Sequence, residues 1–230
     1  LRVETYNKTF DNLLTLKESP LDTENEDEDA TDTANTTNEF WDTKGNSQGI
    51  EFLVKKSSGR LNGWVGYTYS KTKYDNEISG SHFPGFDRTH TLNIVGNFML
   101  TKTLQLSSSI TQMSGNPYTN IIGRVTEWNQ SISEESRWFP YDKYLVGQKN
   151  SARYEDYFRL DMGITRKGGN LFGVEYDTNI QIINLTRHFN ALTYQYRINR
   201  DLVTGDQLGV QRRAISMFPL IITLGVKVVF

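Results

Sequence analysis

The stretch PLIITLGVKVVF, residues 219–230, indicates the fold class because its apolar residues stand at alternate positions. These residues are Leu220, Ile222, Leu224, Val226 and Val228. Successive side chains of a β-strand point to opposite faces, so the five share one face. A chain end frays in water unless something holds it. The stretch therefore predicts a strand whose apolar face contacts something other than water.

The same two-residue alternation recurs along the chain, whereas helical periodicity is hard to find. Most of the alternating segments reach the ~9–11 residues that a tilted membrane-spanning strand needs. Strands of soluble proteins are typically nearer to about 5–6 residues. We expect eight strands, at residues 3–16, 49–56, 61–71, 88–100, 104–114, 157–166, 171–184 and 220–230.

Short and long connections alternate between these segments. The short ones are residues 57–60, 101–103 and 167–170, and the long polar ones are residues 17–46, 72–87, 115–156 and 186–219. Outer-membrane β-sheets have short periplasmic turns and long external loops. The rhythm therefore predicts an all-β fold, a transmembrane up-and-down antiparallel β-barrel wall of about eight strands. The last long connection has room for a short hairpin above the membrane.

Aromatic residues support this interpretation, because alternation alone also occurs in half-buried sheets of soluble proteins. Three stand near the short-turn end of the apolar face and three near the long-loop end, namely Phe98, Phe172 and Phe230, and Tyr67, Tyr69 and Phe158. Two aromatic rows at separate levels are typical of the girdles of a membrane barrel. His90 is expected on the same face near the outer row, where it would pack against its neighbours.

Composition excludes several classes of function. The 230 residues include no cysteine, so disulfides and thiolate metal sites are impossible. The formal net charge of −2 gives no general attraction to nucleic acid. The three histidines lack metal-ligand spacing, and no catalytic or nucleotide-binding glycine motif occurs. No apolar run of ~18 residues predicts a transmembrane helix. We expect neither an enzyme nor a cofactor.

Six stretches resemble the C-terminal part of TonB-dependent outer-membrane receptors in their order and spacing. They are GRLNGWVGYTYSKT, FPGFDRTHTLNIVGNF, SGNPYT, YFRLDMGITRK, IINLTRHFN and LGVKVVF, and together they cover nearly the whole chain. The resemblance implies the last eight strands of a barrel of about twenty-two strands, in the outer membrane of a Gram-negative bacterium. It also implies energy-coupled import of a scarce solute such as a metal chelate, a glycan or a peptide. In this family the terminal aromatic residue, here Phe230, serves barrel assembly.

The resemblance implies partners as well as a fold. They are outer-membrane lipid, the remaining barrel and plug segments, the TonB complex acting through the plug, and, in some members, an extracellular lid lipoprotein. No plug domain or energy-coupling box is found in residues 1–230, so we expect a fragment, a proteolytic piece or one part of a split barrel.

The alternative is a complete eight-stranded outer-membrane barrel with a structural or adhesive role, since eight strands can close. Such a barrel would pair its first strand with its last. The long connections contain too many residues for the narrow rim of an eight-stranded barrel, which favours the larger receptor.

Charged residues are expected on the polar face, where they would line the solute path, dock a plug or pair across strands for register. They are Glu51, Lys55, Arg159, Asp161, Glu175 and Asp177.

Aromatic residues in the third long connection are expected either to contact a solute or lid protein, or to pack the loop against its neighbours. They are Trp128, Trp138, Phe139, Tyr141 and Tyr144. The acidic run at residues 23–39 predicts a solvated loop. Calcium is its less favoured alternative, because the spacing and central glycine of a calcium loop are absent.

Overall fold

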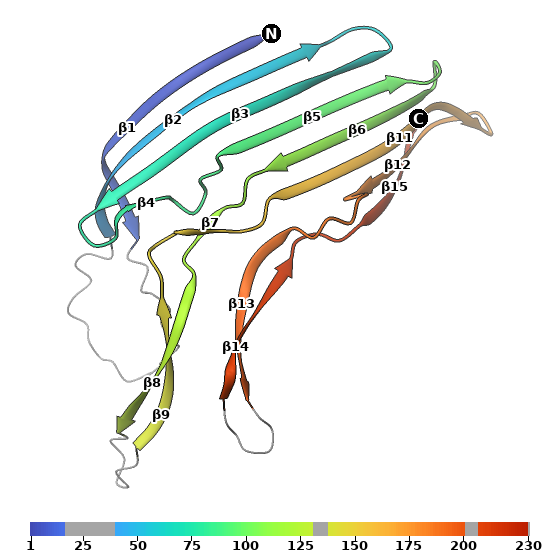
Figure 1. Cartoon of the computed structure of the whole chain (residues 1–230). Coiled ribbons are helices and arrows are strands. Elements are labelled where there is room, and N and C mark those ends of the chain that lie inside the picture. The colour runs from blue at the N-terminus through green and yellow to red at the C-terminus, as the bar shows by residue number, and fades with distance from the viewer. Residues whose placement is uncertain (17–39, 131–137, 201–206, 230) are drawn as a thin grey trace, which may run out of the picture.

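The computed structural model describes residues 1–16, 40–130, 138–200 and 207–229 and is all-β over these ranges. Eight strands follow one another in a single antiparallel sheet (Figure 1). They are β1 (Arg2–Leu16), β2 (Phe40–Lys56), β3 (Leu61–Asn76), β5 (His90–Met99), β6 (Leu104–Met113), β11 (Tyr157–Leu171), β12 (Val174–Ile183) and β15 (Ile221–Val229). They correspond to the eight expected segments. Within the described ranges, no helix is long and apolar enough to cross a membrane.

Shorter strands stand at the long-connection end of this sheet. A short strand, β4 (Gly80–His82), pairs with the end of β3. Two hairpins, β8 (Ile121–Gln130) with β9 (Trp138–Val146) and β13 (Ala191–Arg200) with β14 (Gln207–Ser216), extend away from the sheet (Figure 1). The pair β7 (Pro117–Tyr118) and β10 (Ala152–Arg153) connects the first hairpin to β6 and β11.

The strand register joins the apolar sides of the seven strands from β2 to β15 into one continuous surface, here called the apolar face. One row of directly opposed residues crosses five strands, Val54, Val65, Ile94, Ile110 and Leu160. A second row continues it through Leu106, Ile164, Ile180 and Leu224. The opposite surface, the polar face, carries the row Asn62, Asn97, Ser107, Gly163, Gln181 and Thr223. The predicted separation into two faces therefore holds from β2 to β15.

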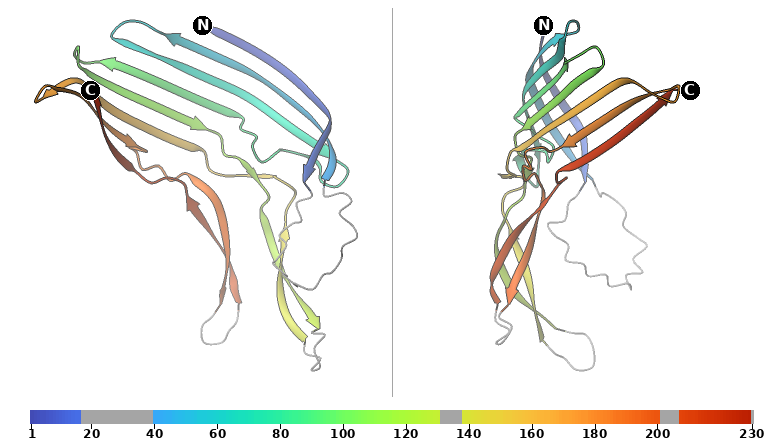
Figure 2. Two further views of the ribbon diagram at one scale, coloured as in Figure 1. Left: turned by 180° about the vertical axis from the view of Figure 1, so that it is seen from behind. Right: turned by 90° about the vertical axis from the view of Figure 1, so that its right-hand side faces the viewer.

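No second layer covers the apolar face in the part of the chain that the structure describes. The sheet is a single curved layer when viewed from the side (Figure 2). None of the described apolar residues is buried, and Ile222, Leu224 and Val226 on β15 are 61, 77 and 68% exposed. An uncovered apolar surface of this extent is unfavourable in water. The sheet therefore lacks the core on which a soluble domain depends.

Both edges of the sheet are open among the described residues. β1 pairs with β2 alone, and β15 pairs with β12 alone. A closed eight-stranded barrel would require β1 to pair with β15. The open edges expose backbone N–H and C=O groups that need partners outside these eight strands.

The expected boundaries were wrong at three places. The third strand continues to Asn76 rather than ending at residue 71. The second strand begins at Phe40 rather than at residue 49. The turn expected at residues 167–170 is a β-bulge, because Gly168 has a φ of 69° and donates its N–H to Asp177 Oδ1 (3.0 Å). The chain turns instead at Phe172 and Gly173, whose φ angles are 53° and 83°. Phe172 is therefore a 97% exposed turn residue and not part of a strand face.

The third long connection contains four strands, β7, β8, β9 and β10, which the sequence analysis did not predict. The hairpin expected in the last long connection is confirmed as β13 and β14. The acidic run at residues 23–39 and the terminal Phe230 lie outside the described residues.

Candidate functional site

The six charged residues singled out from the sequence all occupy the polar face by register. Their opposed positions are those of other polar-face residues, for example Thr68 opposite Glu51 and Lys227 opposite Asp177. Glu51, Lys55 and Glu175 are exposed there. These three side chains are accessible from the polar side of the sheet, as contact with a solute or a plug would require.

Arg159 and Asp161 are used within the sheet. Arg159 Nε lies 3.0 Å from Asp161 Oδ2, so the ion pair runs along β11 rather than across strands. Asp161 Oδ1 also accepts a hydrogen bond from the backbone N–H of Asn184 (3.0 Å). Asp161 is only 8% exposed. This carboxylate therefore holds the end of β12 against β11.

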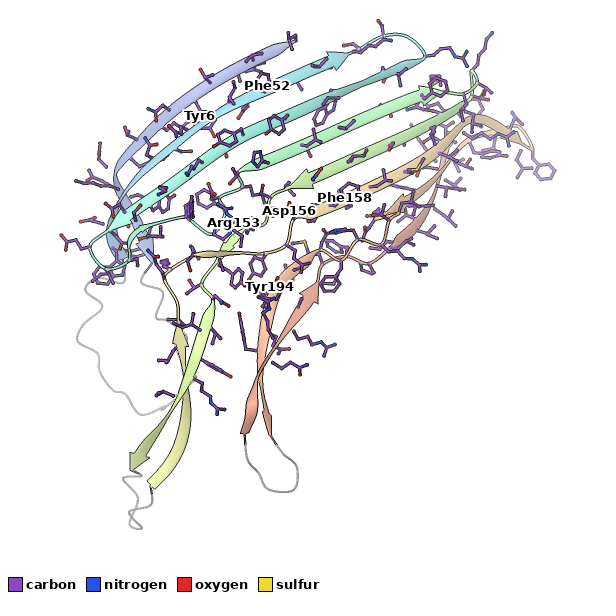
Figure 3. All side chains as sticks on the ribbon, viewed as in Figure 1. Tyr6, Phe52, Arg153, Asp156, Phe158 and Tyr194 are labelled. Atoms are coloured by element: carbon purple, nitrogen blue, oxygen red, sulfur yellow. The ribbon has the colours of Figure 1, made fainter. Side chains whose placement is uncertain are left out.

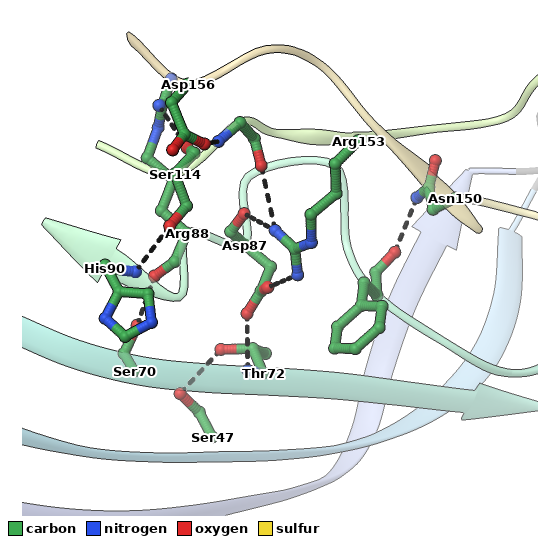
Figure 4. A network of polar contacts seen from close by, with 12 residues as sticks. Ser47, Ser70, Thr72, Asp87, Arg88, His90, Ser114, Asn150, Arg153 and Asp156 are labelled. Carbon is green, nitrogen blue, oxygen red and sulfur yellow. Dashed lines mark hydrogen bonds and ion pairs between the residues drawn. The ribbon is translucent and has the colours of Figure 1, made fainter. Parts of the chain in front are cut away.

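An ion pair between a half-buried arginine and a buried carboxylate fixes the rim where the sheet meets the hairpins (Figure 4). Arg153 Nη2 on β10 lies 2.5 Å from Asp87 Oδ2, and the Asp87 side chain is fully buried. Asp87 Oδ1 accepts the N–H of Thr72 (2.7 Å), at the stretch of β3 beyond its pairing with β5. Arg153 Nη1 donates to the carbonyl oxygens of Asp87 and Gly115 (3.1 and 3.0 Å). One arginine thus joins three segments of the rim.

Gly115 lets these segments approach one another. A Cβ on this residue would lie 1.8 Å from the carbonyl oxygen of Tyr154, so no larger residue fits without a backbone shift. Its N–H donates to Asp156 Oδ1 (3.1 Å), and the preceding Ser114 accepts a hydrogen bond from Arg88 Nη1 at its carbonyl oxygen (2.9 Å). The stretch SGNPYT therefore serves a close backbone crossing.

Two asparagines tie the second hairpin to the sheet. Asn190 Oδ1 accepts the N–H of Phe158, and Asn190 Nδ2 donates to the Phe158 carbonyl, both at 2.9 Å. The Asn190 side chain therefore makes the two hydrogen bonds to the Phe158 backbone that a neighbouring strand would otherwise make. Asn184 donates to the carbonyl oxygens of His188 and Phe218 (3.1 Å each). Asn184 and Asn190 are 2 and 4% exposed, so both amides belong to the frame of the rim.

Three tyrosines connect the two hairpin regions. The ring centroids of Tyr118, Tyr154 and Tyr194 lie 4.5 to 5.2 Å apart. The Arg212 guanidinium lies 4.2 Å from the Tyr194 centroid, and its Nη1 donates to the Tyr118 hydroxyl (3.1 Å). Figure 3 shows Tyr194 at the base of the β13–β14 hairpin. Burial raises the pKa of Tyr194, while the positive charge of Arg212 acts in the opposite direction.

A recess of about 330 Å³ lies beside this tyrosine cluster. Its walls come from the start of β8 and from the facing side of the second hairpin, where Tyr196 stands opposite Arg212. The lining residues are Asn120, Ile121, Ile122, Gly123, Arg124, Tyr196 and Arg212. Two are arginines and none of the seven is acidic. The Tyr196 hydroxyl donates to Asn120 Oδ1 (3.1 Å), which holds the two walls together.

The aromatic residues predicted for ligand contact lie on the first hairpin. Trp128 is on β8, and Trp138, Phe139 and Tyr141 are on β9, but these four side chains lie outside the described part of the structure. Tyr144 is half-buried and stands directly opposite Arg124, a residue of the recess. Tyr144 is thereby linked to the recess.

Sequence analysis missed the Asp87–Arg153 pair, the two asparagines and the tyrosine cluster. The available signal was the set of stretches FPGFDRTH, SGNPYT and IINLTRHFN, which supplied the resemblance without assigning roles to their residues. The described residues include no group of three or more histidines and carboxylates that could hold a metal ion. Comparison of the chain with protein-family models, curated proteins and solved structures finds no match.

Proposed function

We propose that this chain forms part of the barrel wall of a TonB-dependent outer-membrane receptor. The observation that supports this proposal best is the continuous apolar face without any buried apolar core among the described residues. Lipid is the medium in which such a surface is stable. The opposite face then lines a water-containing or plugged lumen, and the hairpins stand on the outside of the cell.

The open edges favour a receptor over the small closed barrel. In lipid, the free backbone groups of β1 and β15 require further strands. The remaining barrel strands complete the wall, a plug occupies the lumen, and the TonB complex supplies energy through the plug. In this arrangement Glu51, Lys55 and Glu175 are the polar-face charges that contact the plug or the passing solute.

The recess between the hairpins is the first contact for the solute in this proposal. Arginine binds carboxylate and phosphate through paired N–H donors. Arg124 and Arg212 therefore favour a solute with acidic groups, whether a metal chelate, an acidic glycan or a peptide. The aromatic residues of β8 and β9, including Trp128 and Trp138, contact the solute or a lid lipoprotein above it.

Single-cysteine labelling tests the assignment of the two faces, because the native chain has no cysteine to interfere. Ile180→Cys and Asn179→Cys are adjacent on β12 but belong to opposite faces. In the full receptor in lipid vesicles, we expect a water-soluble maleimide to label Asn179→Cys and to leave Ile180→Cys largely unlabelled. A lipid-borne quencher should affect a fluorophore placed at Ile180 only. Equal labelling of both positions, or a folded monomer in buffer without detergent, would refute the proposal.

A further inference from the structure

The apolar face changes character near the long-connection end of β3. Val65, Tyr67, Tyr69, Lys71 and Lys73 occupy alternate positions of this strand and share one face. β3 has 16 residues, whereas about 9–11 suffice to cross a membrane. The two lysines therefore come where the strand leaves the hydrocarbon, on the side that faces lipid in the proposed function.

An aromatic cluster marks the level just below the lysines. The Tyr67 hydroxyl lies 2.8 Å from His90 Nδ1, and the Tyr69 and His90 rings are 5.3 Å apart. Phe52 on β2 approaches Tyr67 at 6.4 Å. Aromatic rings with polar tips are typical of the interface between hydrocarbon and headgroups. Lys71 follows Tyr69 by about 7 Å along the strand, at the height of lipid phosphates.

Three cationic side chains lie close to the ring of Phe83 at this end of β3. The ammonium groups of Lys71 and Lys73 lie 5.9 and 5.6 Å from the centroid of its ring, and the Arg153 guanidinium lies 4.9 Å from it. Its backbone is fixed by Asn150 Nδ2, which donates to the Phe83 carbonyl oxygen (2.7 Å). The ring therefore holds two lysines together on the outer surface of the sheet.

Among the described residues, no carboxylate forms an ion pair with either lysine. Asp87 is committed to Arg153 in the ion pair of the rim. Asp75 is the next acidic residue on this side of β3, and it forms no ion pair with either lysine. Neither Lys71 nor Lys73 forms an ion pair with any residue that the structure describes. Two ammonium groups held on one side of the strand, beside an aromatic cluster and without a described acidic partner, form a site that suits an anion.

We infer that Lys71 and Lys73, positioned by Phe83, bind the phosphate of a membrane lipid headgroup on the outside of the barrel wall. The inference rests on the proposed function, because it needs the apolar face to contact lipid. The acyl chains lie along Tyr67, Val65 and their neighbours, and the headgroup phosphate lies between the two ammonium groups. This site is separate from the recess and binds no transported solute.

Native mass spectrometry of the full receptor, released from mixed phosphatidylglycerol and phosphatidylcholine vesicles, tests the site. We expect retained phosphatidylglycerol to exceed retained phosphatidylcholine. Each basic residue near a charged membrane surface is worth roughly a 5-fold change in binding, so the double variant K71Q/K73Q should lose roughly 25-fold. The variant K71R/K73R should retain the preference, and higher salt should weaken it.

The matched control is Lys227→Gln, which removes an exposed lysine from the polar face of β15. The lipid retention of this variant should equal that of the wild type, and free inorganic phosphate should not displace the bound lipid. If K71Q/K73Q behaves like Lys227→Gln, or if phosphate displaces the lipid, the headgroup site is wrong. A receptor that inserts into the vesicles but shows no lipid preference overturns this inference alone. A receptor that stays in buffer overturns the proposed function as well.

Discussion

The eight-stranded sheet and the rim above it are stabilised in different ways. In the sheet, each of the eight long strands pairs with the long strand that comes before or after it in the chain. Whether a residue is polar or apolar follows from the face of the sheet on which it lies. At the rim, single pairs join distant segments, such as Asp87 with Arg153 and Tyr118 with Arg212. A strand face that contacts the same medium along its whole length produces an alternating pattern in the sequence. A single contact between two distant side chains produces no such pattern. The sheet was therefore predictable and the rim was not.

The largest effect is expected at the rim, for Arg153→Met. The substitution leaves the Asp87 carboxylate buried without its cation, which costs about 3–5 kcal/mol when a buried pair loses one partner. Urea unfolding of the protein in lipid vesicles would measure the change in free energy of unfolding. Arg2→Met is the control, because the Arg2–Glu4 pair is exposed on both sides. That change should cost less than about 1 kcal/mol. Similar losses for both variants would contradict the distinction between rim and sheet.

An intermediate effect is expected on the sheet and depends on the face. Ile180→Arg places a charge on the apolar face and should cost about 2–4 kcal/mol if the position lies at mid-bilayer. Asn179→Arg, one residue away on the polar face, should be tolerated far better. The free energies of unfolding in vesicles would give both values. Equal tolerance would show that the two faces do not contact different media.

The smallest effect concerns the titration of Tyr194 at the rim. Burial raises the pKa of its phenol, so the folded state binds the proton more tightly than the unfolded state. The resulting stabilisation is complete below the ordinary tyrosine pKa of about 10 and is lost as pH rises through the folded-state pKa. Ionisation of a tyrosine raises the absorbance at about 295 nm. The titration of the wild type should show a step above pH 10 that is absent from the titration of Tyr194→Phe.

Arg212→Gln sharpens this measurement. Removing the guanidinium removes the influence that lowers the pKa of Tyr194, so the step should move to still higher pH. A step at or below the ordinary tyrosine value would show that the ring is not buried between the hairpin regions.

The strand boundaries show where the sequence pattern loses its information. Residues 40–48 precede the apolar part of β2 and are mostly polar on both faces, so alternation could not reveal that the strand begins at Phe40. Gly168 and Gly169 indicated a turn, although glycine also permits a bulge. The choice between the two depends on the Asp177 carboxylate, which accepts the N–H of Gly168 from the neighbouring strand.

The charged residues of the polar face were predictable in position but not in their partners, and the rim contacts were not predictable at all. Alternation put Arg159 and Asp161 on the polar face, but it could not show that Asp161 accepts the N–H of Asn184. The three tyrosines of the rim lie in separate segments of the sequence. Tyr118 comes before β11 and Tyr194 comes after β12, yet their rings are in contact. Only the folded chain brings these rings together, because no local spacing encodes the contact.

The two ends of the second hairpin are joined to each other where the chain leaves and re-enters the sheet. Ile183 already pairs with Ile221, and Asn184 reaches the Phe218 carbonyl before the chain departs into β13. The pairing of β12 with β15 is thus complete before the chain enters the hairpin, so it does not depend on the length or composition of β13 and β14. In the proposed function, replacing this hairpin would change the first contact with the solute and leave the pairing of the sheet strands unchanged.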